Sequence, residues 1–283
     1  MTISIIFAII AYYNHGGNTV MEKYINGLFV KTAGNAKNQP IIFVHGFPLD
    51  HSMWNKQFKG LSKDYYCISY DIRGLGKSHV GDAQYTMEAF KDDLFSIIED
   101  MKIEKAVLCG LSMGGYIALR AVEFAQDRFN ALILCDTKAE ADNDITKLAR
   151  AGAINKINIE GLASFVDGFV PPLFAEEANK ENKTVFNSTI DKAKQHNPQG
   201  VKASLLAMLS RTNTTPFLKK IKIPTLLLVG AQDKLTPPPV MRAIHEKIKD
   251  SEFGVAPRAG HLAPLENPKF VNDMISGFLK RRI

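Results

Sequence analysis

Residues 106–119 read AVLCGLSMGGYIAL, an apolar run, a serine between glycines and a second apolar run. The G-x-S-x-G spacing is typical of a strand that turns abruptly into a helix, with Ser112 at the apex in a strained conformation. Gly110 and Gly114 supply the small neighbours that this turn needs. A serine hydroxyl becomes a good nucleophile only when a base reaches its oxygen and N–H groups stabilise an oxyanion. If the turn serves chemistry, the chain must also supply a histidine, a carboxylate and an oxyanion loop; otherwise it is a glycine-rich turn with an incidental serine.

The composition of the 283 residues is that of an ordinary globular protein with one large core. The formal net charge of +6 comes from scattered lysines and arginines, without a run of like charges, so it favours solubility over nucleic-acid binding. Cys67, Cys109 and Cys135 lie in apolar runs and lack C-x-x-C spacing. This pattern predicts buried, reduced thiols in a cytoplasmic protein, with neither a disulfide nor a metal site.

The N-terminal segment differs from the rest of the chain, because residues 3–13 are almost wholly apolar. This run is too short to span a bilayer, and it has neither a preceding basic residue nor a clear cleavage site. A weak signal peptide or a weak N-terminal membrane association is one interpretation, and an extension before a fold that begins at Met21 is the other. We place residues 1–20 outside the fold, and we expect a first strand pair in residues 22–31 around Asn26-Gly27.

Strands and helices alternate along most of the chain. Thr86 is the expected N-cap of one helix, and Asn267-Pro268 opens the last one. The expected buried strands are residues 41–44, 66–70, 106–111, 131–135, 223–230 and 252–255. This alternation predicts an α/β fold with a mostly parallel central sheet and helices on both faces.

The alternation stops at residues 137–216. Helix-prone stretches at 140–156 and 176–195 flank an apolar piece at 162–174. We therefore predict an α/β core from residues 21–136 and 217–283, with residues 137–216 as an inserted helical cap over the carboxyl ends of the strands. We expect four apolar cap residues to line a substrate pocket, the alternative being that they pack the core of the cap itself: Phe165, Phe169, Leu173 and Phe174.

The partners that Ser112 needs follow later strands. Asp233 comes after strand 223–230, and His261 comes after strand 252–255. Asp136 also follows a strand, but the Gly-x-x-Asp loop favours Asp233 as the acid that orients the histidine. His45 stands at a strand end, where a histidine more often bonds to the backbone than acts as a base.

Two backbone amides are candidates for the oxyanion hole. The Phe47 amide lies in the glycine-containing loop after strand 41–44, and the Met113 amide follows the nucleophile at a helix N-terminus. A further loop, residues 71–78, reads DIRGLGKS and looks superficially like a phosphate-binding loop. Its glycines fit neither the spacing of a P-loop nor that of the dinucleotide-binding fingerprint. We therefore interpret it as a tight turn pinned by Asp71 and Arg73.

Taken together, the motifs HGFP at 45–48, residues 71–78, GLSMG at 110–114, Asp233 and Gly260-His261 resemble the α/β-hydrolase fold family over residues 22–283. Within that family the chain is similar to small capped carboxylesterases and 3-oxoadipate enol-lactonase-like hydrolases. The resemblance implies that Ser112 attacks an acyl carbonyl, His261 moves its proton and Asp233 orients His261. It implies no cofactor and no metal, and a serine nucleophile argues against haloalkane dehalogenase or epoxide hydrolase chemistry.

The expected function is hydrolysis of carboxylic esters of small to medium acyl chain, with a small-molecule ester as the partner. Two alternatives stay open. The same triad can cleave a lactone or a C–C bond in a diketone, and a non-catalytic module of this fold can bind a ligand. The sequence determines neither the natural substrate nor the oligomeric state.

Overall fold

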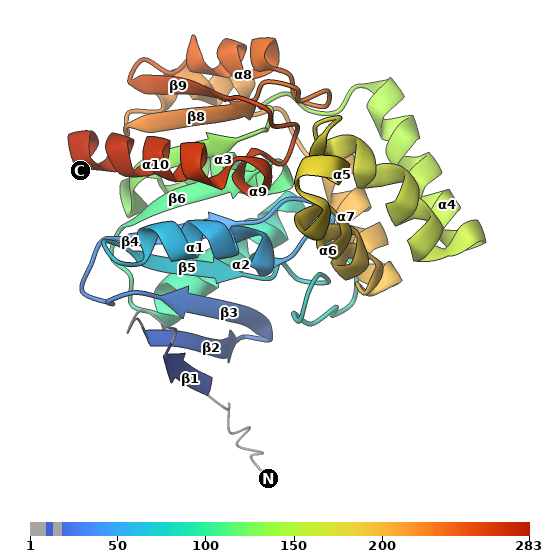
Figure 1. Cartoon of the computed structure of the whole chain (residues 1–283), viewed down its shortest axis with the longest axis horizontal. Coiled ribbons are helices and arrows are strands. Elements are labelled where there is room, and N and C mark those ends of the chain that lie inside the picture. The colour runs from blue at the N-terminus through green and yellow to red at the C-terminus, as the bar shows by residue number, and fades with distance from the viewer. Residues whose placement is uncertain (1–9, 14–18) are drawn as a thin grey trace.

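A computed structural model describes residues 10–13 and 19–283 of the chain. In these residues nine strands form one sheet in the order β1-β2-β3-β5-β4-β6-β7-β8-β9 (Figure 1). The strands are β1 (Ile10–Tyr13), β2 (Thr19–Ile25), β3 (Leu28–Ala33), β4 (Pro40–Val44), β5 (Tyr66–Tyr70), β6 (Ala106–Leu111), β7 (Phe129–Cys135), β8 (Thr225–Gly230) and β9 (Ser251–Ala256).

The sheet is parallel from β5 to β9 and antiparallel at its other edge. β4 pairs in parallel with β5 and β6, and parallel pairing continues through β7, β8 and β9. Every residue of β6 and β8 is buried, as expected for strands covered on both faces. Parallel strands bring their carboxyl ends to one edge of the sheet. The loops after β4, β6, β8 and β9 are therefore gathered there.

Helices cover both faces of this sheet. In Figure 1, α1 and α10 lie together in front of the strands, while α2 and α3 pack on each other behind them. The core helices are α1 (Asn55–Leu61), α2 (Met87–Asp100), α3 (Met113–Ala125), α8 (Pro238–His245), α9 (Ala263–Glu266) and α10 (Pro268–Arg282). The predicted α/β fold is thus confirmed. The Thr86 hydroxyl caps α2, and the Asn267 side chain caps α10.

The antiparallel edge corrects the assignment of residues 1–20. The expected hairpin forms, with Asn26 and Gly27 at positive φ between β2 and β3. However, β2 begins at Thr19, and β1 pairs with it from Ile10 opposite Glu22 to Tyr13 opposite Thr19. An edge strand presents unpaired N–H and C=O groups, which another extended segment can satisfy. Residues 10–13, 19 and 20 therefore belong to the sheet, and the rest of the predicted extension lies outside the described residues.

The segment between β7 and β8 is helical. Its main helices are α4 (Asp144–Phe169), α5 (Ala178–Glu181), α6 (Lys183–Lys194) and α7 (Pro198–Leu209). They lie together at one end of the sheet, on the right in Figure 1. The first part of the apolar stretch 162–174 continues α4 as far as Phe169, after a break at Gly161 with φ 86° and ψ 164°. Whether residues 137–216 act as a cap stays a prediction.

Two expectations from composition concern the rest of the described chain. Cys67, Cys109 and Cys135 lie on β5, β6 and β7, where they are buried and free of disulfides, as predicted. Among residues 10–13 and 19–283, no helix combines the length and the apolar character required to cross a bilayer.

Candidate active site

Ser112 lies at the sharp turn between β6 and α3. Its backbone has φ 54° and ψ −114°, a conformation that a residue with a side chain rarely adopts. The flanking glycines make the turn possible. A Cβ on Gly110 would lie 2.3 Å from the Gly114 carbonyl oxygen, and one on Gly114 would lie 2.2 Å from the Val44 oxygen. The strained turn predicted from G-x-S-x-G is therefore present.

His261 and Asp233 meet at the same edge of the sheet. The Nδ1 atom of His261 lies 2.9 Å from Oδ2 of Asp233, and both side chains are buried. The Thr236 hydroxyl donates to the same Oδ2 at 2.6 Å, while the Thr236 amide donates to Oδ1 at 3.0 Å. These bonds fix the carboxylate and make Nδ1 the protonated ring nitrogen, so that Nε2 is left as the basic atom.

Electrostatics keep Asp233 ionised. Burial alone would raise the pKa of this carboxyl group, but the hydrogen bond and charge of His261, together with the bonds from Thr236, lower it below its ordinary value. His261 Nε2 is buried, and no protein partner for it lies within the described part of the chain. The ring thus has one nitrogen held by a carboxylate and the other free to accept a proton.

Asp136, the alternative acid, occupies a different environment. Its Oδ1 accepts the Gly230 amide at 2.7 Å, and its Oδ2 is buried without a partner among the described residues. Burial and the nearby charge of Asp233 raise the pKa of Asp136 well above its ordinary value. The contact with His261 comes from Asp233, as the sequence favoured, whereas the surroundings of Asp136 disfavour its charged form.

The two amides proposed for the oxyanion hole come from two segments, the loop after β4 and the elbow itself. The Phe47 amide belongs to the loop after β4, and Met113 is the first residue of α3. Gly46 brings that loop against the elbow, because a Cβ there would lie 3.3 Å from Ser112 Cβ. Neither amide donates to a protein acceptor in the described chain, as expected for the first amide of a helix. The oxyanion hole at these two amides stays a prediction.

Ser112 and His261 share no hydrogen bond among the contacts of the described residues. The structure brings His261 to Asp233 and sets Ser112 at the end of a strand in the same parallel sheet. Catalytic hydrogen bonds are often long without substrate and tighten only in the complex. The absence of this hydrogen bond among the described residues therefore does not rule out His261 as a base for Ser112.

The four predicted pocket residues fall into two groups. Phe165 and Phe169 stack on each other with centroids 5.1 Å apart, and both rings contact Phe47, at 6.2 and 5.7 Å. They form an aromatic wall beside the candidate oxyanion loop. Phe174 packs instead against Phe186 of α6, at 5.1 Å, as the alternative interpretation expected.

Leu173 contacts the site through its backbone. Its carbonyl oxygen accepts the His261 amide at 2.7 Å, and its side chain is buried. The predicted contribution of this residue to a pocket wall stays a prediction, whereas its backbone contact with the histidine was not foreseen.

His45 has a structural role, as predicted. Its Nδ1 donates to the Gly46 carbonyl at 2.9 Å, and its Nε2 accepts the Ile72 amide at 2.9 Å. Burial lowers the pKa of His45 and favours the neutral ring that these two bonds require. His45 thereby ties the loop after β4 to the loop after β5.

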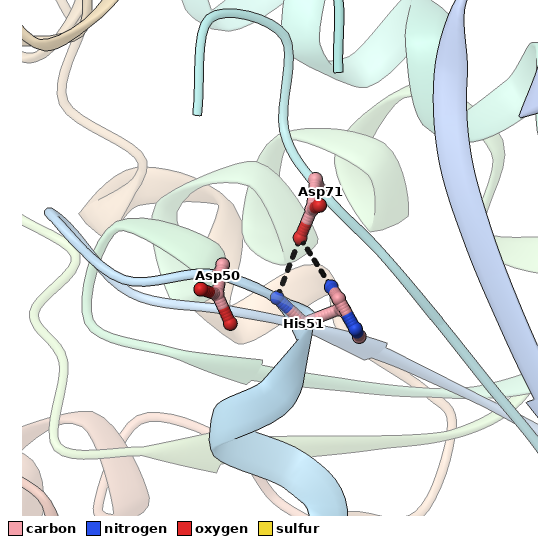
Figure 2. Close-up of side chains that lie close together, drawn as sticks. All are labelled: Asp50, His51 and Asp71. Carbon is pink, nitrogen blue, oxygen red and sulfur yellow. Dashed lines mark hydrogen bonds and ion pairs between the residues drawn. The ribbon is translucent and has the colours of Figure 1, made fainter. Parts of the chain in front are cut away.

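A cluster that can offer metal ligands lies between the segment after β4, which carries Asp50 and His51, and the loop after β5, which carries Asp71. Figure 2 shows Asp50, His51 and Asp71 with their donor atoms close together. One Asp71 oxygen accepts both the amide and Nδ1 of His51 at 2.7 Å, and the other accepts the Lys77 amide at 2.8 Å. Asp50 accepts the Ser52 amide at 2.7 Å. These bonds already use the carboxylates, so the cluster holds the two loops together.

The predicted turn at residues 71–78 is only partly pinned as expected. Asp71 holds it, but Arg73 makes a two-point ion pair with Asp93 of α2, with both distances 2.6 Å. The turn also contacts the helical segment, because the Gly76 amide donates a hydrogen bond to His196 Nδ1 at 3.0 Å.

Comparison with known proteins decides the family. A family model described as the alpha/beta hydrolase fold matches residues 39–268. The chain belongs to the α/β-hydrolase family. A thermophilic esterase from Thermogutta terrifontis, solved with malate bound, is 34% identical with a TM-score of 0.87, and the match covers 98% of this chain and 99% of that one.

Enol-lactonases are also similar to this hydrolase. The 3-oxoadipate enol-lactonase 1 of Acinetobacter baylyi is 29% identical over 253 residues, which are 89% of this chain and 93% of the relative. The enol-lactonase of Burkholderia xenovorans LB400 has a TM-score of 0.84 at 24% identity, covering 92% of this chain and 99% of that one, and supports the fold alone. The predicted resemblance to esterases and enol-lactonases is confirmed.

Two residues of the hydrolase site were missed by sequence reasoning. Thr236 follows Asp233 by three residues, a spacing at which a hydroxyl can return to a carboxylate, and this signal was available. Glu266 accepts amides from Gly260 and Ala175, far apart in the chain. Nothing local in the sequence marks a contact of that kind.

Proposed function

We propose that this hydrolase cleaves carboxylic esters of small to medium acyl chain through a Ser112-His261-Asp233 triad. The observation that carries the proposal is the His261–Asp233 pair, which leaves Nε2 without a protein partner in the described chain. It is joined by the serine held at positive φ at the turn between β6 and α3. The similarity to an esterase over nearly the whole chain supports the ester as the substrate class.

In the proposed reaction, Ser112 Oγ attacks the ester carbonyl carbon while His261 Nε2 takes the hydroxyl proton. The amides of Phe47 and Met113 donate to the oxyanion, each contributing about 3 kcal/mol to transition-state stabilisation. The alcohol leaves with the proton from His261. Water, deprotonated by the same nitrogen, then attacks the acyl-enzyme and releases the acid and Ser112.

The helical segment 137–216 is proposed to cap this site. Its Leu173 carbonyl contacts the His261 amide, and Phe165 and Phe169 contact Phe47. We propose that these two phenylalanines form one wall of the acyl pocket. An apolar wall next to the oxyanion loop suits an acyl chain, because it removes that chain from water.

The test is a panel of p-nitrophenyl esters graded from acetyl to octanoyl. We expect release of p-nitrophenol with the shorter chains, and a loss of kcat of about 10⁴-fold or more in Ser112→Ala, because the nucleophile is gone. Ser96→Ala on α2 is the matched control and keeps the activity. Hydrolysis that survives in Ser112→Ala contradicts the proposed nucleophile.

A second candidate is hydrolysis of a lactone or of a C–C bond in a diketone by the same residues. It is favoured by the 29% identity to an enol-lactonase along 93% of that relative. Parallel panels of lactones, diketones and esters, compared by kcat/KM, separate the two candidates. A kcat/KM for lactones more than tenfold above that for esters makes lactone hydrolysis the first candidate.

A further inference from the structure

The backbone around His261 is held by a carboxylate that the proposed mechanism does not use. The Gly260 amide donates to Glu266 Oε1 at 2.8 Å, and the Leu262 amide donates to the same carboxylate. Glu266 is 8% exposed. The residues on both sides of His261 are thus fixed by one buried acid on α9.

The other oxygen of this acid reaches into the helical segment. Glu266 Oε2 accepts the Ala175 amide at 2.7 Å, and the Leu173 carbonyl accepts the His261 amide at 2.7 Å. A Cβ on Gly260 would lie 2.7 Å from both the Ala175 nitrogen and the Leu173 oxygen. The two backbones are therefore in direct contact, and Glu266 bridges them.

The chemistry of this bridge requires a carboxylate. The Glu266 side chain accepts hydrogen bonds from the amides of two segments, and each of its oxygens accepts at least one of them. Burial raises the pKa of Glu266, although the three amides act against that rise. A glutamine has the same shape, but its NH₂ group cannot accept an amide hydrogen, so one side of the bridge must be lost.

We propose that Glu266 is a positioning residue for His261, through which the location of the helical segment 137–216 controls the orientation of the catalytic imidazole. This inference rests on the proposed function, in which His261 is the base. Movement of Leu173 and Ala175 removes a hydrogen bond from His261 itself and one from Glu266. The loop that carries the imidazole then loses its fixed geometry.

The first test compares Glu266→Gln with Asp93→Asn, a matched control that removes a buried carboxylate paired with Arg73 away from the triad. Misplacement of a catalytic group by about 1 Å costs on the order of 100-fold in rate. We expect Glu266→Gln to lower kcat for p-nitrophenyl acetate by about that factor with KM changed less than about twofold. Both variants are expected to melt at lower temperature. Unchanged kcat in Glu266→Gln, with a lowered melting temperature, overturns the inference.

A second readout does not depend on ester hydrolysis. The proton between His261 Nδ1 and Asp233 gives a proton NMR signal downfield of the amide region. We expect this signal in the wild type and in Asp93→Asn, and its loss or broadening in Glu266→Gln well below the melting temperature. An unchanged signal in Glu266→Gln overturns the inference. A wild type that hydrolyses no ester, yet shows this response, removes the proposed function and leaves the positioning role intact.

A double-mutant cycle tests the coupling to the helical segment. Gly260→Ala pushes Leu173 and Ala175 away from the loop, so it disrupts the contact that Glu266 bridges. We expect the kcat loss of the double variant to be clearly smaller than the product of the two single losses, because both act on one contact. A kcat loss of the double variant that equals the product of the two single losses contradicts the coupling.

Discussion

Two aspartates that follow neighbouring strands have carboxyl pKa values shifted in opposite directions. Asp233, after β8, is kept charged by donors from His261 and Thr236. Asp136, after β7, has one amide donor, and its burial beside that charge raises the pKa of its carboxyl group. Two carboxylates this near each other cannot both ionise without cost. The environment of each side chain therefore assigns the charge to the one that contacts the histidine.

Asp136→Asn tests this assignment through the pH dependence of stability. A carboxyl group with a raised folded pKa binds its proton more tightly in the folded state, so its contribution is complete below the unfolded pKa, near 3.8, and is lost as the pH rises toward the folded pKa. That loss is about 1.4 kcal/mol for each pH unit in this window. Asparagine carries no such penalty. We measure the free energy of unfolding in urea at a series of pH values above 4. We expect the stability of Asp136→Asn, relative to that of the wild type, to increase as the pH rises above the unfolded pKa.

A stability difference that stays constant as the pH rises, or one that decreases, contradicts the raised pKa of Asp136. Asp93→Asn is the control. Asp93 is ion-paired with Arg73, so its replacement is not expected to produce the same rising trend.

At the scale of elements, the regular parts of the fold were predictable because their signals are local. Asn26-Gly27 defines a hairpin, Thr86 caps α2 and the apolar run at residues 225–230 is a strand buried on both faces. The parts that were missed depend on partners distant in the chain. β1 is a strand because the edge of β2 is open to it, and Gly161 breaks α4 inside a sequence that otherwise continues as helix.

In the candidate site, too, the features with a local signal were predictable and those made by distant segments were not. The elbow was visible in five residues, since only glycines fit around Ser112. Asp233 was preferred on its loop pattern, and the contact with His261 agrees. The Glu266 bridge and the Leu173 carbonyl could not be foreseen, because backbone contacts between distant segments leave no pattern in the side chains.

The helical segment offers a prediction about acyl-chain preference. Phe169 contacts Phe47 beside the oxyanion loop, whereas Phe174 packs on Phe186 within the segment. Phe169→Ala enlarges the proposed pocket, so we expect the ester with the highest kcat/KM to shift to a longer acyl chain. Phe174→Ala is the matched control and should lower the melting temperature without that shift. The ester panel measures both, and a shift in Phe174→Ala alone contradicts the assignment of the wall.

At the scale of the molecule, the parallel sheet explains how residues far apart in the sequence meet. Ser112, Asp233 and His261 each follow a strand in one parallel array, so their loops share an edge of the sheet. The helical segment inserted between β7 and β8 reaches the same edge, where Leu173 contacts His261. The core thus carries the three residues of the proposed triad, and the inserted segment contacts the loop that carries His261.

The central claim is that Ser112 is a nucleophile activated by His261. An organophosphonate that reacts covalently only with activated serines tests it most directly, with the modified peptide located by mass spectrometry. We expect a single adduct on the peptide that contains Ser112, its absence in Ser112→Ala and much slower labelling in His261→Ala. A protein that stays unmodified, or one that is modified at another residue, contradicts the claim and favours a module of this fold that binds its ligand without catalysis.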